Sequence, residues 1–177
     1  ALPICGCNPL TVNFTLNSQN ASSFVWDFSD GNTLPSLTTT ATHTYTTAGD
    51  YIPKLVLVDT AGCSVPIIGA DTIRVHDVTA GFETNVNTLC DAGSIYFTNT
   101  TVANDYIVGY EWNFGDGGTS TDVNPIHHYA ALGTYTVSLV AITANGCTDT
   151  ISIDNAVTVL EKPEINIVGD ENVCVPA

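Results

Sequence analysis

The sequence predicts an all-β chain of two tandem antiparallel β-sandwiches, and three observations lead to this prediction. The segment Trp112–Gly117 is a near-copy of Trp26–Gly31, which lies 86 positions earlier. Apolar and polar residues alternate with a period of two in both halves, which is typical of half-buried strands. No segment keeps the 3.6-residue apolar period of an amphipathic helix. At 177 residues the chain has room for two small domains.

Each copy of this segment ends in a predicted tight turn. The Trp and the Phe of each copy are two residues apart, so both side chains are expected to point into a core. Gly31 and Gly117 provide the positive φ that a hairpin turn needs. The preceding Asp30 and Asp116 are expected to accept hydrogen bonds from amides of the turn.

The repeat continues downstream of this turn at a constant offset. His43, Tyr45, Gly49, Tyr51 and Cys63 recur 84 positions later as His127, Tyr129, Gly133, Tyr135 and Cys147. A fixed period of this length indicates two copies of one structural unit. The predicted core consists of the large aromatic residues of both copies, which are Trp26, Phe28, Tyr45 and Tyr51 in the first and Trp112, Phe114, Tyr129 and Tyr135 in the second.

In the first copy, the segment 29–40 is rich in Ser, Thr, Gly and Pro and is therefore predicted as hairpin and loop. Pro53 falls inside a predicted strand, which indicates a position where no neighbouring strand needs the backbone N–H. The strands predicted for the first copy are 10–16, 24–28, 43–45, 51–58 and 67–75.

The second copy shows the same pattern more regularly, with Asn145–Gly146 as a predicted hairpin turn. Residues 78–84 supply a first strand, which the first copy is expected to lack because the sequence begins too late to include it. Residues 164–167 and 174–176 resemble the opening of a third repeat, so the chain is expected to be a section of a longer array. The predicted boundaries are 1–77, 78–161 and 162–177, and the inward-facing residues of the long strand are Tyr135, Val137, Leu139 and Ala141.

These motifs resemble the PKD domain, an immunoglobulin-like module. The family pattern is an aromatic-Asp-Phe-Gly-Asp-Gly turn followed by His-x-Tyr and Gly-x-Tyr. This chain departs from it at Ser29 and at Asn113. The resemblance covers about residues 1–160 and implies two immunoglobulin-like sandwiches in tandem. The Cys-x-Pro and Gly-Cys motifs are similar to those of a cysteine-containing subtype in surface adhesins of gliding bacteria with type IX secretion.

The composition excludes several classes of partner. Eighteen acidic residues against three basic ones give a formal charge of −15, which repels nucleic acid and anionic membranes. No apolar run approaches the ~20 residues that cross a bilayer. Six cysteines in a chain without methionine indicate an oxidising compartment. The chain is therefore expected to be extracellular, and its start at Ala1 is read as that of a mature or excised piece.

Two cysteine pairings remain open. Within each repeat, Cys7 could pair with Cys63 and Cys90 with Cys147. In the immunoglobulin-like arrangement that the resemblance implies, however, these partners lie at opposite poles, roughly 20 Å apart at ~3.3 Å per residue and beyond the ~7 Å limit for a disulfide. Cys7 would then bridge to Cys147 in the neighbouring domain, and Cys90 to a third repeat. Cys5 is left over.

Calcium is the metal that the sequence favours most, because acidic loops near the turns offer hard oxygen ligands. The competing interpretation is that these carboxylates only bond turn amides or face solvent, and no other cofactor is expected. His43 and His127 are interpreted as core or turn-bonded residues, because both occupy the same repeat position. No sequence motif of a hydrolase, kinase or nucleotide-binding site occurs. The calcium candidates are Asp27, Asp30, Asp116 and Asp122, with Asp50 near the same pole.

Three Asp-Thr-apolar triplets resemble the signal for O-glycosylation in bacteria of this group. Their threonines are Thr60, Thr72 and Thr150. Short patterns of this kind recur by chance, and the triplet around Thr150 is equally compatible with a simple strand.

Two functions follow from these features. The first hypothesis is a non-enzymatic structural repeat of a cell-surface fibre or adhesin, with neighbouring repeats and a glycan or surface ligand as partners. The alternative is an accessory binding or spacer module of a secreted hydrolase. A row of exposed aromatic side chains would favour the alternative, and Tyr106 and Tyr110 are the candidates.

Overall fold

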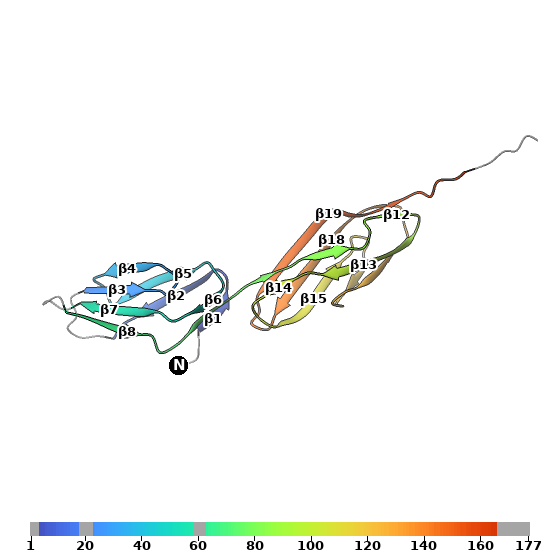
Figure 1. Cartoon of the computed structure of the whole chain (residues 1–177). Helices are drawn as coiled ribbons and strands as arrows, with labels where there is room; N and C mark the ends of the chain where they lie inside the picture. The colour runs from blue at the N-terminus through green and yellow to red at the C-terminus, as the bar shows by residue number, and fades with distance from the viewer. Residues whose placement is uncertain (1–3, 18–22, 59–62, 166–177) are drawn as a thin grey trace, which may run out of the picture.

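The computed structural model describes residues 4–17, 23–58 and 63–165. All regular elements of these residues are strands, and they form two β-sandwiches that follow one another in an elongated molecule (Figure 1). The all-β prediction is confirmed. Below, domain 1 denotes residues 4–77 and domain 2 residues 78–160. No helix of the described residues is long and apolar enough to cross a membrane.

Domain 1 has one four-stranded sheet in the order β4-β3-β7-β8, the pair β2-β5, and the small sheet β1-β9-β6. A purely antiparallel sandwich was predicted, but β1 pairs with β9 in parallel. Its strands are β1 (Ile4–Cys7), β2 (Leu10–Thr15), β3 (Ser23–Asp27), β4 (Thr33–Ser36), β5 (Thr40–Tyr45), β6 (Gly49–Tyr51), β7 (Lys54–Val58), β8 (Ser64–Ile68) and β9 (Ile73–His76).

Domain 2 packs the five-stranded sheet β12-β19-β18-β15-β16 against the three-stranded sheet β11-β13-β17, and β10 pairs with β14. The pairing of β12 with β19 is again parallel. The strands are β10 (Val78–Thr79), β11 (Phe82–Thr84), β12 (Thr88–Cys90), β13 (Gly93–Asn99), β14 (Val102–Ala103), β15 (Ile107–Asn113), β16 (Thr119–Ser120), β17 (Ile126–Tyr129), β18 (Gly133–Thr143) and β19 (Thr148–Leu160).

The two domains differ most where long strands are interrupted. In domain 2, β18 and β19 run almost without a break, whereas domain 1 divides the equivalent segments into β6 and β7 and into β8 and β9. The predictions of single strands at 51–58 and 67–75 were therefore wrong. Pro53 has no N–H to donate to a ladder, and the amide of Gly69 bonds to its carbonyl at 2.8 Å. Both strands consequently break at this level of the sheet.

Two smaller predictions also need correction. The segment 29–40 is not only hairpin and loop, because it contains β4, which pairs with β3. The predicted first strand of domain 2, residues 78–84, is interrupted at Ala80–Gly81 and forms β10 and β11, which pair with different strands.

Each domain has an aromatic core between its sheets. The predicted aromatic residues lie there: Tyr45 and Tyr129 are fully buried, and Tyr51 and Tyr135 are partly buried against the same clusters. The buried aromatic side chains of the two cores are Phe24, Trp26, Phe28 and Tyr45 in domain 1, and Phe82, Phe97, Trp112, Phe114 and Tyr129 in domain 2.

Candidate functional site

The repeated Asp-Gly turn is held by a histidine in each domain. In domain 1, His43 Nε2 donates to Asp30 Oδ2 at 2.7 Å, and the amide of Asn32 donates to Asp30 Oδ1 at 3.0 Å. The imidazole of His43 stacks on Phe28, with 4.0 Å between ring centroids. Tyr45 meets His43 edge-on and donates from its hydroxyl to the Phe28 carbonyl at 3.1 Å.

Domain 2 repeats this arrangement closely. His127 Nε2 donates to Asp116 Oδ2 at 2.8 Å, and the amide of Gly118 donates to Asp116 Oδ1 at 2.9 Å. His127 stacks on Phe114 at 4.0 Å, and the hydroxyl of Tyr129 donates to the Phe114 carbonyl at 3.0 Å. We call the Asp, His, Phe and Tyr of each domain its Asp–His turn.

The Asp–His turn tolerates Ser29 in domain 1 for an identifiable reason. Ser29 adopts φ 63° and its hydroxyl donates to the Ile52 carbonyl at 2.5 Å. The equivalent Gly115 has φ 84°, and a Cβ placed there would collide with the Thr136 carbonyl. Ser29 thus adopts the left-handed backbone conformation of this turn, and its hydroxyl makes a hydrogen bond that a glycine cannot make.

The electrostatics of these turns indicate a structural role. Partial burial acts to raise the pKa of Asp30, but the hydrogen bonds from His43 and Asn32 outweigh it and hold that pKa below the ordinary 3.8. Asp116 behaves in the same way, with His127 and Gly118 as donors. Burial, with Asp30 or Asp116 nearby, raises the pKa of Tyr45 and Tyr129 far above the usual range.

The calcium candidates do not form a metal-ligating cluster. Among residues 4–17, 23–58 and 63–165, no group of three or more His, Cys, Asp or Glu side chains is placed to hold a metal ion. Asp27 accepts a hydrogen bond from the amide of Ser29, and Asp122 from the hydroxyl of Ser120. Asp50 faces Arg74, with 3.8 Å between Nε and the carboxylate. Hydrogen bonds from the protein therefore occupy the carboxylates of the turns.

A disulfide joins the two domains. Cys7, at the end of β1, is bonded to Cys147, at the start of β19, across a sequence separation of 140 residues. Their Cα atoms are 5.4 Å apart, and neither within-domain pair is formed. Cys147 is buried in a small apolar cluster with Val78 and Ala80, and Cys7 packs against it. Cys5 and Cys90 are exposed, with free thiols, and Cys63 is exposed just before β8.

Polar contacts complete this junction. The Asn104 side chain donates to the Val75 carbonyl at 3.1 Å and accepts from the amide of Asp77 at 2.8 Å. The Asn145 side chain lies 3.2 Å from Nε2 of His76. Asp105 accepts hydrogen bonds from both the amide and the side chain of Asn145. The segment from β9 into β10 is thus tied to domain 2 along its length.

The polar part of this junction was not predicted. Two of its residues, Asn104 and Asp105, lie between Phe97 and Trp112, where the repeat offset changes from 83 to 86 and thus indicates a small insertion. This insertion lies at the end of the repeat that also carries the hairpin before Cys147, and its position was the one sequence signal for additional contacts between the domains. What the inserted residues bond could not be deduced from the sequence.

The remaining candidate residues are scattered. Thr60 and the segments 166–177 lie outside the described residues. Thr72 is partly buried before β9, and Thr150 is exposed within β19. Its neighbour Asp149 accepts a hydrogen bond from the amide of Ala80 at 2.8 Å. Tyr106 exposes 76% of its surface, whereas Tyr110 packs against the core, so these two do not form a flat exposed row.

Comparison with known proteins now identifies the fold family. The family model of the PKD domain matches residues 4–75 and again residues 78–159. Both domains of this chain belong to the PKD family. The tandem organisation follows directly from the two matches, and the paired PKD domains account for the repeated Asp–His turn.

The relatives of these PKD domains are enzymes of much greater length. Residues of this chain are 51% identical over 43 residues to Collagenase ColA of Bacillus cereus, covering 24% of the chain and 4% of that protein. They are 30% identical over 140 residues to the pre-pro-metalloprotease PrtV of Vibrio cholerae, covering 68% of the chain and 15% of that protein. The chain thus spans only a small part of these relatives.

Solved structures include single PKD domains. The PKD1 domain of the Vibrio cholerae metalloprotease PrtV is 35% identical and has a TM-score of 0.40, covering 46% of this chain and 94% of that one. The PKD1 domain of Vibrio anguillarum Epp is 32% identical, with a TM-score of 0.41 and coverages of 49% and 95%.

Proposed function

We propose that this chain is a non-catalytic spacer and binding module of an extracellular hydrolase, made of two PKD domains that a disulfide locks in line. The observation that carries the proposal is the junction: Cys7–Cys147 and the Asn104 contacts fix the relation of the two domains. A module that holds two sandwiches at a set spacing is suited to positioning other parts of a longer protein.

Two further observations support this proposal. The relatives with 30% or more identity are named as collagenases and metalloproteases, and this chain matches only a part of each. The Asp–His turns occur once in each domain, and in each of them the histidine is hydrogen-bonded to the aspartate of the same turn. Catalytic groups are rarely placed identically in tandem copies. An extracellular location fits the disulfide, because such bonds persist in oxidising compartments.

A second function, a structural repeat of a cell-surface fibre or adhesin of gliding bacteria with type IX secretion, is favoured by one specific observation. Cys90 stands where Cys7 stands in the first repeat and has an exposed free thiol. In a continuing array, Cys90 would pair with the next repeat as Cys7 pairs with Cys147. Thr72 and Thr150 would be the glycosylation sites of such a fibre within the described residues, and a glycan or surface ligand would be its partner.

One experiment separates the two functions. The native polypeptide that contains this sequence is isolated from culture supernatant and from washed cells, and it is mapped by tryptic mass spectrometry. A protease or other hydrolase domain in the same polypeptide, released into the supernatant, supports the accessory module. A polypeptide of further repeats that stays on the cells, with Cys90 disulfide-bonded to the next repeat, contradicts it and supports the fibre.

A further inference from the structure

The outer face of the four-stranded sheet of domain 1 is apolar across all four strands. One residue of each strand, paired from strand to strand, forms a row that crosses the sheet: Pro35 of β4, Val25 of β3, Val56 of β7 and Pro66 of β8. Trp26 and Leu55, which are sequence neighbours of the two valines, are buried in the core, so this row faces outward. The prolines are exposed and the valines are half-buried. We call these four residues the outer row.

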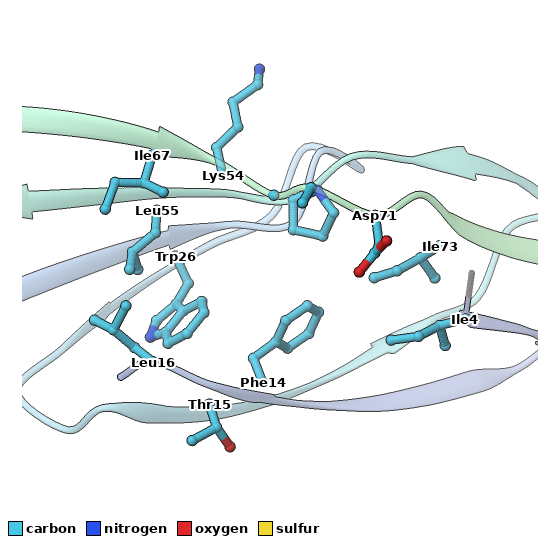
Figure 2. Close-up of a pocket in the computed structure, with 13 residues that line it drawn as sticks. Ile4, Phe14, Thr15, Leu16, Trp26, Lys54, Leu55, Ile67, Asp71 and Ile73 are labelled. Carbon is cyan, nitrogen blue, oxygen red and sulfur yellow. The ribbon is translucent and has the colours of Figure 1, made fainter. Parts of the chain in front are cut away.

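A charged pair lies beside the outer row on the same face. Asp27 of β3 pairs with Lys54 of β7, and Lys54 pairs with Ile68 of β8, which exposes 65% of its surface. Figure 2 shows the side chain of Lys54 pointing away from Trp26 and Leu55, toward the outside of the sheet. The face therefore combines apolar side chains with one negative and one positive charge on adjacent strands.

Domain 2 shows that the fold does not require this apolar face. Its equivalent row contains Glu111 and Thr150, which are exposed and which pair with Val140 from either side. They stand where domain 1 has Val25 and Pro66. Because the same sandwich forms with a carboxylate and a hydroxyl at these positions, the apolar residues of domain 1 serve a purpose other than folding. Exposed apolar surface of this kind marks a contact with another molecule.

A neighbouring repeat does not cover this face. Domain 1 precedes domain 2 and contacts it through Cys147 and through the side chains of Asn104 and Asn145. Glu111 and Thr150 nevertheless remain exposed on the outer face of domain 2. A further repeat placed before domain 1 in the same relation would therefore leave the outer row exposed.

The pattern of this face is self-complementary. When a second copy packs onto it, a two-fold axis parallel to the strands and midway between β3 and β7 exchanges the two halves of the face. Val25 of one copy then lies opposite Val56 of the other, and the two prolines of the outer row also lie opposite one another. We propose that the outer face of domain 1 binds the same face of a second copy of this chain, with Asp27 of each copy opposite Lys54 of the other.

The charge of the chain favours this face over other contacts between copies. Each copy carries a formal charge of −15, so most approaches bring like charges together. The three basic residues are Lys54, Arg74 and Lys162, and domain 2 contains none. The outer face of domain 1 sets one of these three against an aspartate of the other copy, in both directions. This complementarity selects a second copy as the partner.

An axis along the strands gives a parallel dimer. The strands of domain 1 run along the long axis of the molecule (Figure 1). The axis therefore leaves both chains pointing in the same direction, and sheets packed face to face align to within about 30°. The two copies of domain 2 leave the contact on the same side, where their acidic surfaces repel one another. The contact is thus confined to domain 1.

The test uses the 177-residue chain with its disulfide intact and its free thiols blocked by iodoacetamide. Sedimentation equilibrium at roughly 0.15 M salt, where charges on distant parts of two copies are screened, should show a monomer–dimer equilibrium. Val56→Glu places a carboxylate in the outer row and should weaken dimerisation about tenfold or more. Val140→Glu, the matched change in domain 2, should leave the equilibrium unchanged. A parent chain that remains monomeric at roughly 1 mM contradicts the proposal, as does equal weakening by both variants.

An exchange of charges tests how the two copies are placed. Asp27→Lys and Lys54→Asp each leave charges of one sign on the face, so each variant alone should dimerise about tenfold more weakly or worse. An equimolar mixture should form a heterodimer with an affinity near that of the parent, because each aspartate again meets a lysine. The chain that carries both substitutions should recover the homodimer. A mixture that associates no better than its components rules out the two-fold arrangement.

Folding controls accompany these variants. Asp27 accepts a hydrogen bond from the amide of Ser29, which Asp27→Lys removes. Asp27→Asn retains an acceptor, as Asn113 does for the amide of Gly115 in domain 2, and should weaken dimerisation less than Asp27→Lys. Thermal unfolding shows which variants are folded. Val56→Glu and Lys54→Asp remove no side-chain hydrogen bond of the described residues, so they decide the question even if Asp27→Lys does not fold.

The reactivity of the two lysines locates the contact. As the concentration of the chain is raised and the dimer forms, acetylation of Lys54 should slow several-fold. Acetylation of Lys162, which is exposed after the last strand of domain 2, should not change. Dimerisation that leaves the rate at Lys54 unchanged, or that slows the reaction at Lys162 instead, overturns the assignment to the outer face of domain 1.

Discussion

Nε2 of His43 lies 2.7 Å from Oδ2 of Asp30, and the equivalent atoms of His127 and Asp116 are 2.8 Å apart. This near-identity holds although the two domains differ in their long strands. The Asp–His turn therefore depends on local sequence: the carboxylate caps the turn, and the imidazole, stacked on a phenyl ring, joins the turn to the next strand. Each contact of the constellation can be tested in one domain with the other domain as a reference.

Acid should weaken both domains through these carboxylates. The pKa of Asp30 and of Asp116 is held below the ordinary 3.8, so their contribution to stability is fully present above the unfolded-state pKa and is lost as pH falls through the folded-state value. The melting temperature should drop below about pH 4. In calorimetry, the double variant Asp30→Asn and Asp116→Asn should be less stable than the parent at neutral pH. Its melting temperature should also fall less on acidification than that of the parent. A parallel loss in parent and variant would contradict this prediction.

Gly115→Ala should destabilise domain 2. The backbone at Gly115 has φ 84°, and the added methyl group meets the Thr136 carbonyl. Strain of this kind costs about 1–3 kcal/mol. Ser29→Gly is the matched change in domain 1 and should cost less, because it removes only a hydrogen bond to Ile52 and relieves φ 63°. Chemical denaturation followed by near-ultraviolet circular dichroism measures both; a larger loss for Ser29→Gly would refute the steric argument.

Cys7→Ser and Cys147→Ser should loosen the junction. Removing a disulfide of this loop length typically costs about 2–5 kcal/mol. Small-angle X-ray scattering should then show a wider range of interdomain angles, since the remaining ties are mainly the Asn104 and Asn145 contacts. Cys5→Ser is the control, because the thiol of Cys5 is free. Scattering curves that coincide for the parent and Cys147→Ser would show that the disulfide adds no rigidity.

Tyr129→Phe should destabilise domain 2 by about 1–3 kcal/mol, because it leaves the buried carbonyl of Phe114 without its donor. Tyr135→Phe, whose hydroxyl bonds the exposed Ala131 carbonyl, should have a smaller effect, since water can replace that bond. Urea unfolding of the two variants gives the comparison. Equal losses would mean that the carbonyl of Phe114 is reached by water after all.

The sequence predicted those features that depend on neighbouring residues. Trp112 and Phe114 alternate with polar residues and end in Asp-Gly, so their burial and the turn could be deduced from a period of two and from turn chemistry. Gly117 was assigned a positive φ on the same basis, and it has φ 94°. The resemblance to the PKD family predicted the β-sandwich fold and the placement of the cysteines at opposite ends of each domain.

The features that escaped prediction depend on residues far apart in the chain. The break at Pro53 involves a hydrogen bond from the amide of Gly69 to the Pro53 carbonyl. Neither residue by itself indicates that this bond forms. Asn104 bonds the backbone between the domains only because the insertion that contains it folds over that segment.

The position of Cys7 and Cys147 near opposite ends of the chain has a mechanical consequence. A pull applied between residue 4 and residue 165 passes along β1, crosses the sulfur–sulfur bond and continues along β19, so residues 8–146 carry no load. Most of both sandwiches lies within this bypassed loop. Under tension the molecule can lengthen only by peeling its first and last strands, which makes it behave as a short, nearly inextensible link.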